Sequence, residues 1–275
     1  MLQALIITAP GINCDLELAE AFSLAGAEPR YVHLNALLGN PSIIDEADLI
    51  GLPGGFSYGD AVAAGRIMAY LMREKLYPKF VEALRRGVPM IAPCNGLQIA
   101  VQLGLLPGPT PGSDWSETPP IPCVALAQNS SARFIDTWVE FCVPSETRCI
   151  WTKNLTSTPE SSVIPIAHGE GRFVPASSEV LQSLEENGQV ACRYGANDNP
   201  NGSIGDVMGI CDASGLVFGL MPHPERFLRW TQHPTWTRLS DEETQGNTIG
   251  LQMFINAVTY ANQNKATSNC VEQSV

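Results

Sequence analysis

One stretch, residues 88–106, most constrains the fold of this 275-residue chain. An apolar run over Val88–Ala92 is long enough only for a buried strand, and apolar residues then recur at helical spacing up to Gly104. Cys94 therefore falls where a strand turns into a helix. This layout is typical of a nucleophile elbow, in which helix amides point at the side chain and the helix dipole favours the thiolate. A buried core cysteine is the alternative interpretation.

Strands and helices alternate along the first 105 residues. Apolar strands are predicted over Leu2–Thr8, Arg30–Leu34 and Leu49–Leu52, and helices over Asp15–Ala25, 61–72 and 78–86. Such alternation is typical of an α/β fold with a doubly wound, mostly parallel sheet. Ligands of these sheets bind at the carboxyl ends of the strands, which is where Cys94 is expected.

The second half of the chain is richer in predicted strands. It follows a loop rich in Pro, Gly, Ser and Thr over 105–122. No break in composition separates the halves, so residues 1–263 are expected to form a single domain and residues 264–275 a flexible tail. Strands are predicted over 123–128, 137–143, 163–167, 189–194, 207–211 and 216–221, and one long helix over 248–263.

Composition excludes several classes of partner. The formal net charge of −12 would repel nucleic acid and anionic membranes at long range. The eight cysteines include no C-x-x-C pair and no zinc-like spacing, so we expect reduced thiols, no metal site and a cytoplasmic location. No run of about 18 apolar residues is present, so no membrane span is expected.

A thiol nucleophile needs a base, and the base needs an orienting acid. His223 and Glu225 lie two residues apart after the strand predicted at 216–221, so both point to the same side and Glu225 could fix the imidazole tautomer. His168 has Glu170 at the same spacing, so spacing alone leaves both histidines open. The glycines that flank His168 favour a binding loop over a base.

Cys14 is the rival nucleophile, because it too follows a strand and begins a helix. The next residue, Asp15, opposes thiolate formation there. For the elbow, a backbone N–H from the loop at Gly54 and Gly55 and the N–H of Asn95 could form an oxyanion hole with two donors.

The same glycine loop could instead cradle a phosphate group. It ends in Gly59 and Asp60, however, where a P-loop requires Gly-Lys followed by Ser or Thr. No other ATP signature is visible in the sequence. Any step driven by ATP would therefore reside on another polypeptide.

Four motifs together resemble the class I glutamine amidotransferases. Within this class they look like the glutaminase subunits of phosphoribosylformylglycinamidine synthases, which act in purine biosynthesis. The similarity extends to about residue 260 and implies a flavodoxin-like α/β fold. The motifs are Pro-Gly-Gly-Phe-Ser-Tyr-Gly-Asp at 53–60, Cys-Asn-Gly-Leu-Gln at 94–98, Ala-His-Gly-Glu-Gly-Arg at 167–172 and Met-Pro-His-Pro-Glu-Arg at 221–226.

The resemblance implies a role for individual residues of these motifs. Cys94 would attack the side-chain amide of glutamine, His223 would shuttle protons, and Glu225 would orient His223. Gly55 and Asn95 would supply the oxyanion donors. The substrate-binding residues would be Gly54, Gln98, His168, Gly169 and Glu170, the last three mainly through their backbone.

The resemblance also implies partners. The released ammonia would pass to a larger synthetase subunit, which uses ATP and Mg²⁺ to convert formylglycinamide ribonucleotide to formylglycinamidine ribonucleotide, with a small third subunit in many bacteria and archaea. This chain would hold no cofactor itself. The segment Phe227–Leu239, with Trp230 and Trp236, and the loop Asn129–Phe134 are candidate docking elements. A free-standing thiol hydrolase and a non-catalytic scaffold are the alternatives, and the intact Cys, His and Glu set argues against the scaffold.

Overall fold

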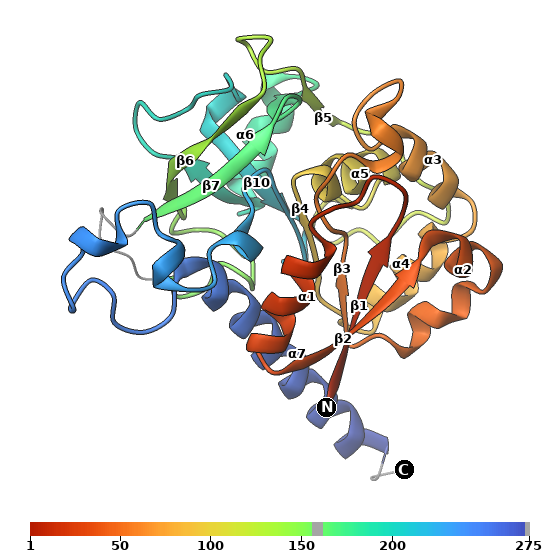
Figure 1. Ribbon diagram of the computed structural model, residues 1–275. Helices are drawn as coiled ribbons and strands as arrows, with labels where there is room; N and C mark the ends of the chain where they lie inside the picture. Colours follow the sequence, from red (N-terminus) through yellow and green to blue (C-terminus); the bar gives the residue numbers. More distant parts are fainter. Residues whose placement is uncertain (156–161, 273–275) are drawn as a thin grey trace.

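The computed structural model describes residues 1–155 and 162–272 (Figure 1). These described residues form a nine-stranded mixed sheet in the order β2-β1-β3-β4-β11-β10-β9-β6-β7, together with a separate two-stranded sheet of β5 and β8. None of the helices in this part of the chain is long and apolar enough to cross a membrane.

One half of the large sheet is parallel. Its strands pair β1 with β2 and β3, β3 with β4, and β4 with β11, so their carboxyl ends share one edge. The order 2-1-3-4 followed by a fifth parallel strand is that of flavodoxin-like sheets. The predicted doubly wound α/β fold is therefore confirmed, with the parallel strands forming one half of a mixed sheet. The strands are β1 (Leu2–Thr8), β2 (Ala27–His33), β3 (Leu49–Gly51), β4 (Met90–Pro93) and β11 (Val217–Leu220).

The other half of the sheet is antiparallel, and it confirms the β-rich second half of the chain. Its strands are β10 (Val207–Cys211), β9 (Val190–Tyr194), β6 (Ile135–Cys142) and β7 (Val163–His168). Beside it, β5 (Val124–Ala127) pairs with β8 (Arg172–Pro175). The sequence did not predict β8, because a four-residue strand that includes an arginine and a proline lacks an apolar run.

Helices cover both faces of the sheet (Figure 1). On one face, α1 (Asp15–Leu24) and α7 (Ile249–Glu272) contribute residues such as Phe22 and Phe254 to one apolar cluster. A second cluster contains Met68, Phe80 and Leu97 from the other helices. These are α3 (Arg66–Arg73), α4 (Tyr77–Arg85) and α5 (Asn95–Leu103). The active-site edge of the sheet is thus held between two helical layers.

The structure differs from the predicted helices in three places. The helix predicted over 61–72 begins only at Arg66, because Tyr58, Asp60 and Val62 have positive φ and cannot enter a right-handed helix. Two short helices were missed, α2 (Leu34–Gly39) and α6 (Ser178–Glu186), although Val180, Leu181 and Leu184 in α6 recur at helical spacing. The last helix extends to Glu272, into the expected tail, of which residues 273–275 lie outside the described residues.

Short 3₁₀ helices connect several elements. One of them, η4 (Pro224–Arg226), follows β11 and carries part of the predicted site. The others are η1 (Pro41–Glu46), η2 (Ser57–Asp60), η3 (Ile204–Asp206), η5 (Trp230–Gln232) and η6 (Trp236–Arg238).

Candidate active site

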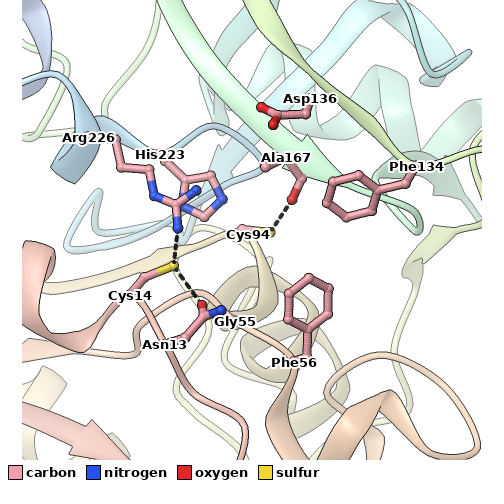
Figure 2. Close-up of a pocket in the computed structure, with 10 residues that line it drawn as sticks. All are labelled: Asn13, Cys14, Gly55, Phe56, Cys94, Phe134, Asp136, Ala167, His223 and Arg226. Atoms are coloured by element: carbon pink, nitrogen blue, oxygen red, sulfur yellow. Dashed lines mark hydrogen bonds between the residues drawn. The ribbon is translucent and has the colours of Figure 1, made fainter. Parts of the chain in front are cut away.

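A pocket of about 210 Å³ lies where the loops after β1, β3, β4 and β11 meet (Figure 2). This volume is below the ~300–1,000 Å³ of pockets for drug-sized ligands, so the pocket suits a small substrate. The predicted nucleophile and the predicted base both line it. The lining residues are Asn13, Cys14, Gly55, Phe56, Cys94, Phe134, Asp136, Ala167, His223 and Arg226.

Cys94 sits at the turn between β4 and α5, as predicted. Its φ of 50° and ψ of −108° are strained for a residue with a side chain. Its N–H is held by the carbonyl of Leu220 at 2.7 Å. Close packing behind the turn requires glycine at position 96, because a Cβ there would lie 2.1 Å from the Leu52 carbonyl oxygen. The strain is therefore fixed by the neighbouring strands β11 and β3.

His223 and Glu225 form a buried pair beside Cys94. Nδ1 of His223 lies 2.7 Å from Oε1 of Glu225, and the two side chains are 2% and 0% exposed. Burial alone would lower the pKa of His223, but the charge of Glu225 and contacts with Cys94 and Cys14 outweigh it, so the pKa is raised. The imidazole can therefore accept and hold a proton at neutral pH.

The imidazole ring packs directly on Gly54. A Cβ at this position would lie 2.8 Å from Cε1 of His223, so any larger residue would displace the ring. On the opposite side of the nucleophile, Sγ of Cys94 lies 3.6 Å from the carbonyl oxygen of Ala167 in β7. The sulfur thus lies between the parallel half of the sheet and the antiparallel half.

The two predicted oxyanion donors flank the same turn. Gly55 lines the pocket with a φ of 138°, and a Cβ there would lie 2.7 Å from the backbone nitrogen of Asn13. Asn95 is the first residue of α5, so its N–H has no partner within the helix. Its side chain accepts a hydrogen bond from the N–H of Ser57 at 3.2 Å, which ties the glycine loop to the elbow. Their action as donors stays a prediction.

The predicted substrate-binding residues form a layer behind the pocket. Nε2 of Gln98 donates to the Glu170 carbonyl oxygen at 2.6 Å, and its Oε1 accepts from Asn95 at 2.9 Å. The carboxylate of Glu170 accepts from the N–H of Ala64 at 3.2 Å. These bonds join the elbow helix, the 57–65 loop and the loop at Gly169. A direct contact of these residues with glutamine stays a prediction.

His168, the rival base, does not line the pocket. Its Nδ1 lies 3.1 Å from Oδ1 of Asn129, and this oxygen also accepts from the N–H of Gly171 at 3.1 Å. Nδ1 is therefore the protonated nitrogen of a neutral imidazole. Burial, reinforced by the charge of His223, lowers the pKa of His168 to about 4. The structure thus gives only His223 the position of a base.

Six pocket residues were given no role in the site from the sequence: Asn13, Phe56, Phe134, Asp136, Ala167 and Arg226. Arg226 and Phe56 lie inside two of the quoted motifs, so the sequence did contain an indication that they belong to the site. Asp136 reaches the pocket because β6 pairs it with Ala167 of β7, and no local pattern predicts that pairing. Phe134 lies just before β6, and its ring centroid is 6.2 Å from that of Phe56.

One cluster of metal-binding residue types lies at the pocket. Ligand atoms of Cys14, His223 and Glu225 lie within 4.8 Å of one another, and the described residues contain no other such group. Nη2 of Arg226 donates to the same Cys14 sulfur at 3.0 Å. A cation would therefore meet a guanidinium at this point, and the contacts form a hydrogen-bonded network instead.

Comparison with known proteins agrees with this fold and site, which together define the class of glutamine amidotransferases. Residues 1–261 match the family described as CobB/CobQ-like glutamine amidotransferase domain. Among curated relatives, the phosphoribosylformylglycinamidine synthase subunit PurQ of Dehalococcoides mccartyi is 39% identical, over 95% of this chain and 98% of its own. The PurQ of Treponema denticola is 36% identical over 94% and 98%.

The structural comparison points the same way. A chain of the structure of PurLQS from Thermotoga maritima matches with a TM-score of 0.66 and 34% identity, over 94% of this chain and 98% of that chain. The chain belongs to the PurQ family of glutamine amidotransferases. The class predicted from the four motifs is confirmed.

Proposed function

We propose that this chain hydrolyses glutamine to glutamate and ammonia in the cytoplasm, and that the ammonia passes to an ATP-dependent synthetase subunit. The observation that carries the proposal is the single small pocket shared by a strained thiol and a buried imidazole–carboxylate pair. Free thiols at all seven cysteines whose side chains are described support the location.

The first half of the reaction forms a thioester. His223 takes the proton of Cys94, and the sulfur attacks the amide carbon of glutamine. The oxyanion that forms is stabilised by the N–H groups of Gly55 and Asn95. The imidazolium then gives its proton to the leaving nitrogen, the C–N bond breaks, and ammonia departs. Glu225 holds the imidazole tautomer and stabilises the imidazolium throughout.

The second half regenerates the thiol. Water attacks the thioester carbon while His223 accepts a proton from it, and the C–S bond breaks to release glutamate. The proton returns from His223 to the sulfur of Cys94. One water is consumed, and one glutamate and one ammonia are produced.

The amino-acid end of the substrate needs partners for two charges. The Asp136 carboxylate lines the pocket and has no hydrogen bond or ion pair within the described residues, so it is placed to receive the α-ammonium group. Backbone N–H groups of the loop from His168 to Glu170 would receive the α-carboxylate, with Gln98 holding that loop in place.

The ammonia acceptor is assigned to another subunit. This chain presents Gly59 and Asp60 where a phosphate-binding loop would need lysine and a hydroxyl, so ATP and Mg²⁺ belong to the partner in this proposal. PurQ relatives are named as subunits of phosphoribosylformylglycinamidine synthase, which supports conversion of formylglycinamide ribonucleotide to formylglycinamidine ribonucleotide by the assembled complex. The name of the Thermotoga maritima structure, PurLQS, supports a complex of this chain with further subunits.

A labelling experiment tests the proposal at its centre. An electrophilic glutamine analogue should form an adduct with Cys94, and mass mapping should find Cys14 unmodified. Cys94→Ala should abolish both labelling and glutamine hydrolysis. An adduct on Cys14, or hydrolysis that persists in Cys94→Ala, would overturn the assignment.

A further inference from the structure

Cys14 has a place in the pocket that the proposed reaction does not use. It is 1% exposed and lies immediately before α1, yet its sulfur faces the base and not the core. Sγ accepts a hydrogen bond from Nη2 of Arg226 at 3.0 Å and donates to Oδ1 of Asn13 at 3.2 Å (Figure 2). A nitrogen of the His223 imidazole also lies within 4.8 Å of the sulfur. Three polar groups thus occupy the surroundings of one buried thiol.

Cys14, Gly54 and Glu225 lie around the edge of the His223 ring that carries Nδ1. A Cβ on Gly54 would lie 2.8 Å from Cε1 of His223, 3.3 Å from its Nδ1 and 3.3 Å from the Cys14 sulfur. The ring edge and the sulfur therefore meet at the same point of the glycine loop. Glu225 occupies the remaining side at 2.7 Å from Nδ1. The sulfur and the Glu225 carboxylate therefore both limit the space at this edge of the ring.

If the Arg226 guanidinium were not held in place, it could compete with His223 for the Glu225 carboxylate. Arg226 is the next residue in the chain, and Oε2 of Glu225 is buried without a hydrogen-bond partner among the described residues. A guanidinium that paired with this carboxylate would draw it away from His223. Two residues at the start of α1 hold Arg226 instead: Cys14 at 3.0 Å and Glu17 at 3.8 Å.

We propose that Cys14 is a positioning residue of the active site: its sulfur anchors the Arg226 guanidinium and braces the imidazole of His223, so that Glu225 remains free to orient the base toward Cys94. The inference rests on the proposed function for its consequence in catalysis. Its structural content, the orientation and proton affinity of His223, does not depend on any substrate.

The charged and titratable groups around His223 come from four segments. Glu225 and Arg226 belong to η4, Cys94 to the elbow, Cys14 to the start of α1, and His168 to β7. Removal of Cys14 deletes one contact that raises the pKa of His223 and leaves the burial that lowers it. The imidazolium should therefore lose its proton at lower pH.

The test uses the full chain and needs no substrate. The chain has only four histidines, so imidazole ¹⁵N spectra can follow the titration and tautomer of His223 in wild type and variants. In parallel, the rate of Cys94 alkylation by iodoacetamide is measured against pH. The variants are Cys14→Ala, Cys14→Ser and Arg226→Met, with Cys149→Ala as the matched control, since Cys149 is another buried cysteine, 2% exposed and in the core.

Cys14→Ala should lower the pKa of His223 and move the basic limb of the alkylation profile to lower pH, with a decrease of about tenfold or more in kcat and little change in KM. Cys14→Ser keeps an acceptor for Arg226 and should stay within about threefold of wild type. Arg226→Met removes the competing guanidinium itself, so the Glu225–His223 pair should persist and the pKa of His223 should not fall as it does in Cys14→Ala. Cys149→Ala should change neither profile.

Unchanged His223 titration and Cys94 alkylation in Cys14→Ala would overturn the inference, and so would a clear fall in the pKa of His223 in Arg226→Met. So would a Cys14→Ser variant as impaired as Cys14→Ala. Failure of the proposed function has a different signature: the titration would shift as expected, but no variant, nor the wild type, would hydrolyse glutamine.

Discussion

At the scale of single residues, identical side chains have unequal chemistry because their surroundings differ. Cys94 and Cys14 line the same pocket, but only Cys94 has the strained backbone of an elbow, with φ at 50°. His223 and His168 both lie two residues before a glutamate, but only His223 contacts its glutamate, at 2.7 Å. Glu170 instead accepts from Ala64. Tertiary contacts, and not spacing, decide between such alternatives.

Asp136→Asn should weaken substrate binding. The change removes the negative charge proposed to receive the α-ammonium group, and hydrogen bonds to charged groups contribute about 1.5–3 kcal/mol, so KM for glutamine should rise about tenfold or more with kcat less affected. Steady-state kinetics with glutamine and with glutaramate, which lacks the ammonium, provide the check. Wild type should prefer glutamine, and the variant should lose most of that preference. Equal discrimination by both proteins would remove this role from Asp136.

His168 should make the stability of the fold depend on pH. Its pKa of about 4 in the folded chain lies below the ordinary value of 6.5, so the unfolded chain binds the extra proton first. The stabilisation is fully present above pH 6.5 and is lost as the pH falls toward 4, by about 3 kcal/mol. Denaturant unfolding of wild type and His168→Asn between pH 7 and pH 4 should show a smaller loss in the variant.

The exposed His33 provides the control for this measurement. His33 caps α2 through its ring nitrogen, and asparagine is also a good cap, so His33→Asn should preserve the fold and retain the wild-type loss of stability. A His168→Asn variant that loses as much stability as wild type on acidification would show that other groups cause it.

At the scale of elements, the elbow depends on how closely α5 approaches β3. Gly96→Ala would place a Cβ 2.1 Å from the Leu52 carbonyl oxygen, so α5 and the strand that leads to Gly54 must separate. Overpacking costs about 1–3 kcal/mol, and a misplacement of about 1 Å can lower a rate about 100-fold. We expect a lower melting temperature and a severe loss of kcat, measured by thermal unfolding and glutaminase assay.

A matched glycine variant separates local crowding from general effects. Gly39→Ala, at the end of α2, adds a methyl group where no atom lies within 4 Å. It should leave kcat and the melting temperature near their wild-type values. If Gly96→Ala also left kcat and the melting temperature unchanged, close packing behind the elbow would not matter for catalysis or stability.

The elements that were predicted best are those whose residue pattern is recognisable within a short stretch of sequence. β4 and α5 were recognised because a buried apolar run meets a helical period at Cys94. The 57–65 loop was predicted partly as helix, since positive φ at Tyr58, Asp60 and Val62 leaves no trace in residue type. Asp136 was missed because its approach to the pocket depends on the pairing of β6 with β7, which brings together segments about 30 residues apart.

At the scale of the whole molecule, the site joins the two halves of the sheet. The parallel half supplies Cys94, His223 and the glycine loop, whereas the antiparallel half supplies Ala167, Asp136 and Phe134. The two halves meet where β11 pairs with β10. A partner that contacts both halves at the pocket can therefore change the geometry of catalysis without touching the thiol.

Exposed aromatic residues indicate where such a partner can bind. Phe56 and Phe134, at the mouth of the pocket, are 44% and 53% exposed, and Trp236 in η6 is 48% exposed. Trp230 is the other tryptophan of the predicted docking segment. It packs on Phe227 and donates its indole N–H to the carbonyl oxygen of Gly246 at 3.0 Å, so its contacts stabilise this segment of the chain itself. Aromatic side chains of this kind are enriched among the residues that carry interface energy.

The isolated chain should be a poor glutaminase, and the synthetase subunit with its nucleotide should raise kcat by about tenfold or more, because docking can order the loops of such a site. Trp236→Ala should reduce this stimulation while the adduct of Cys94 with the glutamine analogue still forms. Tyr31→Ala removes an aromatic residue of similar exposure, 47%, from β2 at the other edge of the sheet, and should retain full stimulation. Glutamine hydrolysis titrated with the synthetase measures all three proteins. Full activity of the chain alone, unchanged by the partner, would instead favour a free-standing hydrolase.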